Sequence, residues 1–128
     1  MASSAPPPRP VVLVVEDDAL LRYHALDVVE SAGYEAIEAE NADEAIRILE
    51  RRTDVRLIFT DIDMPGSMDG LKLAAVVRNR WPPVEIIVTS GVRGIAESDL
   101  PTRGLFISKP YSADHVTAAM RNFINPAH

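Results

Sequence analysis

The chain has 128 residues, a length that predicts one domain with a single hydrophobic core and leaves no room for a second domain of ordinary size. Apolar residues make up 47% of the sequence and charged residues 25%, which is typical of a globular protein and excludes a disordered polar chain. The lack of cysteine excludes disulfides and thiolate sites and fits a cytoplasmic location, while the formal net charge of -6 disfavours direct binding to nucleic acid.

Short tails are expected at both ends of the chain. Residues 1–10 hold four prolines and no apolar run, which predicts a flexible proline-rich tail and not a secretory signal. Residues 126–128 are expected to form a C-terminal tail, so the domain itself should span 11–125. The longest early apolar stretch is far too short to cross a bilayer, and no membrane role is expected.

Five short apolar runs alternate with segments of helical period, which predicts an α/β domain with a parallel sheet and helices on both of its faces. The first run, VVLVV, is apolar at every position, as expected of a central parallel strand that is buried on both sides. The expected strands are 11–15, 35–39, 55–60, 84–89 and 105–108.

The helices are predicted from apolar stripes and from residues that favour helix ends. The expected end signals are Gly33 after the first helix, the Asn41 cap with Glu44 at the start of the second, Asp69 at the start of the third and the Ser112 cap of the last. The expected buried stripes are Leu21, Ala25, Val28, Val29 and Ala32 in the first helix, Leu73, Ala74 and Val77 in the third, and Val116, Ala119, Met120 and Phe123 in the last.

The second helix should end near Arg52, and prolines at 82–83 and 126 should end the third and the last. The segment 91–104, between the fourth and fifth strands, contains three glycines and a proline. It predicts a short or mobile element instead of a regular helix.

Charged and hydroxyl side chains follow four of the five expected strands. Because parallel strands present their carboxyl ends at the same edge of a sheet, residues far apart in sequence should meet there. The first strand is followed by Glu16, Asp17 and Asp18, the third by Asp61, the fourth ends in Thr89 and Ser90, and the fifth is followed by Lys109.

These strand-end residues predict a magnesium site. If the first and third strands are neighbours, each close pair of carboxylates repels by roughly 4 kcal/mol at an effective dielectric constant near 20, and one lysine cannot neutralise them all. A hard divalent cation can, and Mg²⁺ prefers one or two carboxylates, a carbonyl oxygen and several retained waters. Mg²⁺ is therefore the expected cofactor, and Asp61 the carboxylate that attacks a phosphoryl group.

The stretches VVEDD, FTDIDMPGSMDG, IIVTSG and FISKPY together resemble the successive motifs of the response-regulator receiver family. The resemblance covers about Val11 to Asn125, and four motifs in this order are far more specific than any one of them. It implies a flavodoxin-like, doubly wound sheet with strand order 2-1-3-4-5 and phosphorylation of Asp61. The other implied site residues are Asp17 as a direct Mg²⁺ ligand, Glu16 acting through water, the backbone carbonyl of Asp63 as a third protein ligand, Thr89 and Lys109 on the phosphoryl group, and Phe106 as an aromatic switch.

The family resemblance also implies a function. The chain is expected to be a stand-alone receiver in a two-component phosphorelay, phosphorylated by a sensor histidine kinase or a phosphotransfer protein. Its output is expected to be binding to an unknown protein target, as a monomer or weak homodimer, with no enzymatic activity beyond Mg²⁺-dependent self-phosphorylation and slow autodephosphorylation. Glu16 stands where the family often has aspartate, so one of the carboxylates at the metal site is carried by a longer side chain.

Three alternatives remain open from the sequence. A haloacid-dehalogenase-type phosphatase would use Asp61 as nucleophile and Asp63 as acid and base, although such enzymes carry this motif on their first strand. A pseudo-receiver would bind a partner without being phosphorylated, and a flavodoxin-like protein would bind FMN, which the carboxylates after the first strand disfavour. Phe106 is expected in the core on any interpretation, and His24, His115 and His128 suggest no shared role.

Overall fold

The computed structural model describes residues 9–64, 68–91, 100 and 103–124, and these residues form five strands and four helices. The elements are β1 (Val11–Val15), α1 (Ala19–Ser31), β2 (Glu35–Ala39), α2 (Ala42–Arg51), β3 (Val55–Asp61), α3 (Gly70–Arg80), β4 (Glu85–Ser90), β5 (Gly104–Ser108) and α4 (Ala113–Ile124). The predictions for Pro126 and for most of the N-terminal tail and of segment 91–104 lie outside the described residues.

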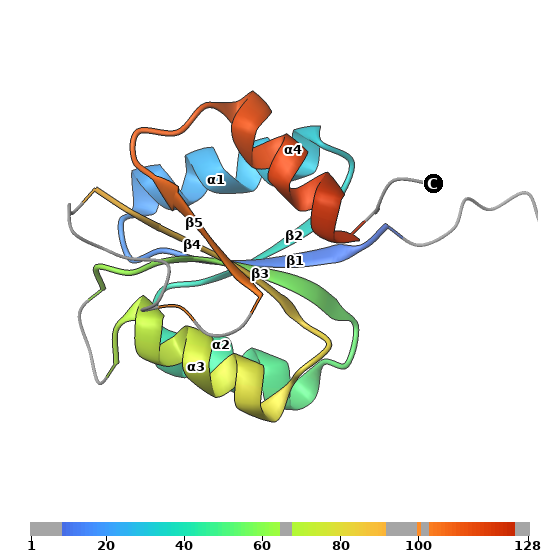
Figure 1. The fold of residues 1–128 in the computed structure, drawn as a ribbon, viewed down its shortest axis with the longest axis vertical. Coiled ribbons are helices and arrows are strands. Elements are labelled where there is room, and N and C mark those ends of the chain that lie inside the picture. Colours follow the sequence, from blue (N-terminus) through green and yellow to red (C-terminus); the bar gives the residue numbers. More distant parts are fainter. Residues whose placement is uncertain (1–8, 65–67, 92–99, 101–102, 125–128) are drawn as a thin grey trace, which may run out of the picture.

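The strands form one parallel sheet in the order β2-β1-β3-β4-β5, which confirms the predicted fold class (Figure 1). β1 lies beside β3, with Val15 opposite Thr60, and β3 lies beside β4, with Asp61 opposite Thr89. From β1 the chain continues to β2 on one side, whereas from β3 it continues to β4 and β5 on the other. The strand order therefore reverses direction between β1 and β3. In such folds the ligand site lies outside the carboxyl ends of the strands at this point.

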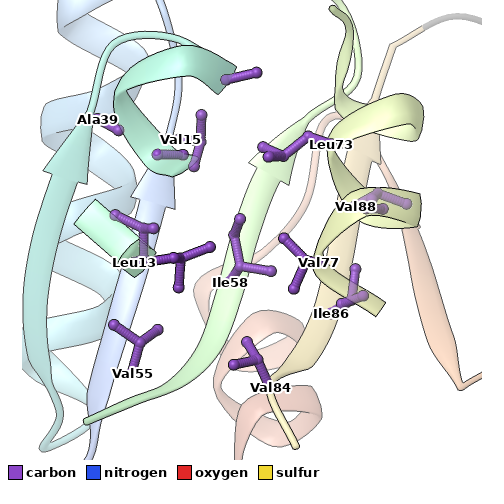
Figure 2. Close-up of a cluster of buried hydrophobic side chains, with 14 of the residues drawn as sticks. Leu13, Val15, Ala39, Val55, Ile58, Leu73, Val77, Val84, Ile86 and Val88 are labelled. Carbon is purple, nitrogen blue, oxygen red and sulfur yellow. The ribbon is translucent and has the colours of Figure 1, made fainter. Parts of the chain in front are cut away.

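Helices α1 and α4 cover one face of the sheet, and α2 and α3 cover the other (Figure 1). Every residue of β1 is buried, because Leu13 faces the α2 and α3 layer while Val12 and Val14 face the α1 and α4 layer. Figure 2 shows the first of these cores, in which Ile58 of β3 lies between Leu13 and Val77. Burial on both faces explains the continuous apolar run of the first strand.

The predicted helix-end signals are present in the structure. Asn41 Oδ1 accepts the backbone N–H of Glu44 at 2.8 Å, and Glu44 Oε1 accepts the backbone N–H of Glu40 at 2.7 Å. Ser112 Oγ accepts the backbone N–H of His115 at 3.0 Å, and Gly33 follows α1 with a φ of 99°. Each cap satisfies a backbone donor that the first turn of a helix leaves unpaired.

One part of the predicted helix packing is wrong. Leu21 was expected in the buried stripe of α1, but it is 43% exposed, while Ala25, Val28 and Val29 are buried. Leu21 lies in the first turn of α1, which begins four residues after the end of β1. In α4, Ile124 belongs to the buried face as well, and Phe123 is only half-buried.

The limits of three strands differ from the predictions by one residue. β3 continues to Asp61, β4 begins at Glu85 and ends at Ser90, and β5 begins at Gly104. Asp61 and Ser90 are thus held by strand pairing and do not belong to loops. Within the described part of the chain, no helix combines the length and apolar character that crossing a bilayer requires.

Candidate functional site

Three carboxylates gather at the carboxyl ends of β1 and β3. Glu16 and Asp17 directly follow β1, and Asp61 is the last residue of β3. One carboxylate oxygen from each of the three lies within 4.8 Å of the others. Glu16 and Asp61 are 6% and 5% exposed, whereas Asp17 is exposed. The pairing of β1 with β3 brings these residues together, as the sequence predicted.

Lys109 lies between the two buried carboxylates. Its Nζ is 3.4 Å from Glu16 Oε1 and 3.4 Å from Asp61 Oδ1, and its backbone N–H donates to Ser90 O at 2.9 Å. Three carboxylates against one ammonium leave the site with an excess of negative charge. This excess suits a further cation more than an anion.

The electrostatics of the site oppose the charged form of both buried acids. Burial raises the pKa of Asp61, and the attraction of Lys109 only partly offsets this effect. Burial is also the main cause that raises the pKa of Glu16, and the Asp61 charge adds to it. For Lys109, burial alone would lower the pKa, but Asp61 and Glu16 outweigh burial and the pKa is raised. Lys109 therefore stays protonated, and the carboxylates remain short of positive charge.

The donor set fits a hard divalent cation such as Mg²⁺. Carboxylate oxygens from Glu16, Asp17 and Asp61 converge within the span that one ion can bridge, and Mg²⁺ uses few protein ligands and keeps several waters. The Asp63 carboxylate is held by Ser90, since its Oδ2 accepts a hydrogen bond from Ser90 Oγ at 2.7 Å, and its charge adds to the burial that raises the pKa of Asp61. The backbone N–H of Asp63 donates to Asp61 Oδ1 at 3.3 Å, which orients the central carboxylate.

Thr89 supplies a hydroxyl beside Asp61. The two residues are partners across β3 and β4, and Thr89 is 4% exposed. Its Oγ1 is buried and has no hydrogen-bond partner among the described residues. A buried hydroxyl without a partner carries a free-energy cost, and one explanation for such a group is a ligand that it binds during function.

Two further residues shape the site, and no motif in the sequence indicates either role. Gly70, the first residue of α3, donates its N–H to Ile62 O at 3.0 Å, and a Cβ at this position would collide with the Asp61 carbonyl oxygen. Arg22 of α1 donates from Nη1 to the Glu16 carbonyl at 2.9 Å and from Nε to Glu38 Oε1 at 2.9 Å. Asp69 had been expected only to mark the start of the third helix, and Arg22 has no motif around it.

A hollow of about 420 Å³ opens beside the carboxylates, between the start of α1 and the segment that follows β5. Its lining includes Leu21 and the stacked rings of His24 and Tyr111, whose centroids are 6.1 Å apart. The sequence had suggested no role for His24. The exposure of Leu21 noted above therefore has a local reason, since its side chain borders this hollow.

Phe106 lies in β5 opposite Val88 and is half-buried against the core under α2 and α3. It therefore packs against the edge of the core and does not lie inside it, and its role as a switch stays a prediction.

Comparison with known proteins agrees with this arrangement. The family model "Response regulator receiver domain" matches residues 12–121. The chain belongs to this family. Asp61 lies on the third strand of this receiver domain, and no support remains for the phosphatase or the FMN-binding alternative.

Curated relatives of this receiver domain differ in length. CpdR of Brucella abortus, a response regulator receiver protein, is 32% identical over 103 residues, which cover 78% of this chain and 84% of CpdR. FleR of Pseudomonas aeruginosa, a response regulator protein, is 30% identical over 105 residues, which cover 80% of this chain but 22% of FleR. The receiver domain spans about a quarter of the length of the first curated relatives that it matches.

Solved structures share the fold along nearly the whole receiver domain. A response regulator receiver protein from Pseudomonas putida superposes with a TM-score of 0.79 at 30% identity, covering 89% of this chain and 97% of the other. TrrA from Thermotoga maritima, solved in complex with Mg²⁺-BeF, has a TM-score of 0.78 at 23% identity and covers 89% of this chain and 98% of TrrA. The likeness to TrrA concerns the fold alone.

Proposed function

We propose that this receiver domain accepts a phosphoryl group on Asp61 from a histidine kinase or a phosphotransfer protein in a two-component phosphorelay. The observation that carries this proposal is the set of groups around one buried carboxylate. Lys109 Nζ lies 3.4 Å from Asp61 Oδ1, and the unpartnered Thr89 hydroxyl lies on the neighbouring strand. A hydrogen-bond donor and a cation beside a carboxylate nucleophile are what phosphoryl transfer requires.

In the proposed reaction a carboxylate oxygen of Asp61 attacks the phosphorus of the donor. A new P–O bond to Asp61 forms while the P–N bond to the donor histidine breaks, and the imidazole leaves with the electron pair. Lys109 offsets the negative charge of the transferred group, and the Thr89 hydroxyl donates a hydrogen bond to one of its oxygens. Hydrolysis of the aspartyl phosphate by water would return the carboxylate slowly.

Mg²⁺ is part of the proposal. The ligands would be the carboxylates of Asp17 and Asp61 and the backbone carbonyl of Asp63, with Glu16 acting largely through water. When bound, Mg²⁺ offsets the charge that the carboxylates and the phosphoryl oxygens bring together. The cluster of three carboxylate oxygens supports this assignment, as does the Mg²⁺-BeF complex of TrrA, a protein of the same fold.

A protein donor also needs a surface beside Asp61. In the first turns of α1, Leu20 is 76% exposed and Tyr23 is 71% exposed, next to the hollow that borders Glu16 and Lys109. Large exposed apolar side chains grouped beside a reactive site favour a macromolecular phosphodonor. A downstream protein target would respond to the phosphorylated conformer, with Phe106 as the residue that changes position. The stand-alone arrangement stays a prediction, because the relatives include both short and long proteins.

Acetyl phosphate with Mg²⁺ tests the proposal directly. Wild-type protein should gain one phosphoryl group by intact-mass spectrometry, with acetate leaving the donor, while Asp61→Asn should gain none. Addition of EDTA should prevent the reaction. Labelling of the Asp61→Asn variant at another residue would contradict the assignment, and an unreactive wild type would favour the pseudo-receiver alternative.

A further inference from the structure

Ser90 joins the ends of three strands. It is the last residue of β4, and it is 1% exposed. Its backbone carbonyl accepts the N–H of Lys109, just beyond β5, at 2.9 Å. Its hydroxyl donates to Asp63 Oδ2, just beyond β3, at 2.7 Å. One small buried residue therefore contacts both the segment that carries the lysine and the segment that follows the nucleophile.

Asp63 links Ser90 to Asp61. Its backbone N–H donates to Asp61 Oδ1 at 3.3 Å, while its carboxylate is held on the β4 side by Ser90. Asp63 is itself exposed and could adopt other rotamers without this hydrogen bond. Its negative charge already adds to the burial that raises the pKa of Asp61, and a carboxylate freed from Ser90 could move closer to the three clustered carboxylates and their single lysine.

We propose that Ser90 is a positioning residue of the phosphoacceptor site and acts through Asp63. Its hydroxyl keeps the Asp63 carboxylate from moving closer to the approaching phosphoryl group and keeps the Asp63 backbone placed to orient Asp61. The inference rests on the proposed phosphorylation of Asp61, and it assigns to Ser90 a role in the rate of that reaction.

The sign of the effect follows from charge. A phosphoryl group is an anion, so a carboxylate that turns toward it opposes its approach. Loss of the Ser90 hydroxyl should therefore slow phosphorylation only while residue 63 carries a charged side chain. Once that side chain is removed, the hydroxyl no longer has a carboxylate at residue 63 to hold.

A double-mutant cycle tests this dependence. The rate constant of phosphorylation by acetyl phosphate at saturating Mg²⁺ would be measured for the wild type, Ser90→Ala, Asp63→Ala and the double variant. We expect Ser90→Ala to be slower than the wild type by about fivefold, a size typical of the net contribution of one intramolecular hydrogen bond. In the Asp63→Ala background the same change should alter the rate by less than twofold.

Two controls separate positioning from folding. Ser108→Ala changes the exposed serine that is paired with Ser90 across β5 and should leave the rate unchanged. Ser90→Thr retains the hydroxyl and should recover most of the rate. Unfolding by urea would be followed for every variant, so that a rate loss can be compared with any loss of stability.

The possible failures can be told apart. Equal losses from Ser90→Ala in both backgrounds, or no loss in the wild-type background, would overturn the role of Ser90 and leave the proposed function intact. A wild-type protein that takes up no phosphoryl group would overturn both.

Discussion

Asp61 and Glu16 are acidic residues in a place that disfavours their charge. Both are nearly fully buried, and burial raises the pKa of each. At an effective dielectric constant near 20, two carboxylates about 4 Å apart repel by roughly 4 kcal/mol, which Lys109 offsets only in part. Such a cluster costs stability, and an arrangement of this kind is typical of a site that binds a cation or a reacting group.

The Thr89 hydroxyl provides the first test at this scale. Thr89→Val replaces a buried hydroxyl that has no partner among the described residues with a methyl group of nearly the same size. The free energy of unfolding should stay equal or rise by about 1 kcal/mol, because an unsatisfied buried group is removed. The rate of phosphorylation by acetyl phosphate should fall by at least about tenfold, since a donor to the transferred group is lost.

Both quantities would be measured on the same preparation, by urea unfolding and by intact-mass time courses. A large loss of stability in Thr89→Val would show that the hydroxyl supports the fold. An unchanged rate would remove Thr89 from the site.

At the scale of elements, the site depends on how α3 meets the end of β3. Asp69 caps α3 by accepting the backbone N–H of Lys72 at 2.9 Å, and Gly70 then packs directly on the backbone of Asp61 and Ile62. The absence of a side chain at Gly70 allows this approach. Asp61 is therefore held in place both by its pairing with β4 and by the first residue of α3.

Gly70→Ala should disturb this packing. The new Cβ would lie 2.8 Å from the Asp61 carbonyl carbon and from Ile62 Cα, so the helix and the strand must separate. We expect a loss of about 2 kcal/mol in the free energy of unfolding, within the range of overpacked cores, together with slower phosphorylation.

Gly91→Ala is the matched control for this substitution. Among the described residues, a Cβ at Gly91 would meet Lys109 Cβ at 3.9 Å, which is an ordinary van der Waals contact. Its unfolding free energy, measured by urea titration, should stay within about 0.5 kcal/mol of the wild type. Equal effects of the two substitutions would contradict the proposed packing role of Gly70.

At the scale of the whole molecule, the sheet order assembles the site from distant parts of the chain. Lys109 and Glu16 are 93 residues apart in sequence and 3.4 Å apart between Nζ and Oε1. β1 and β3 lie side by side at the centre of the sheet, and β4 and β5 follow on one side. Any ligand that binds these strand ends should therefore stabilise the fold as a unit.

Mg²⁺ should show this coupling in thermal unfolding. At a Mg²⁺ concentration ten times its dissociation constant, the free energy of unfolding should rise by about 1.4 kcal/mol, which corresponds to roughly 4 °C in Tm for a domain of this size. Asp17→Asn should lose most of this shift, because it removes one of the three carboxylates.

Asp27→Asn, an exposed change of the same chemistry within α1, should retain the full Mg²⁺ shift. Differential scanning fluorimetry over a Mg²⁺ series measures all three proteins. A shift of equal size in Asp17→Asn would argue against a metal ligand at this position, and a wild type without any shift would argue against the metal site as a whole.

The sequence alone determined the elements, the sheet and the main carboxylates of this protein. Continuous apolar runs such as Val11–Val15 indicate buried parallel strands, Asn41 and Ser112 are local helix signals, and acidic residues at strand ends converge in any parallel sheet. These features depend on neighbours in the chain or on the general geometry of the fold. They could therefore be predicted without coordinates.

Only the tertiary structure decided which side chains meet. Three contacts at the site connect different parts of the chain: Gly70 with Asp61, Arg22 with the Glu16 carbonyl, and Ser90 with Asp63. The exposure of Leu21 also depends on how the elements pack. Each depends on ångström-scale distances between packed layers, and no periodicity or motif in the sequence encodes these distances.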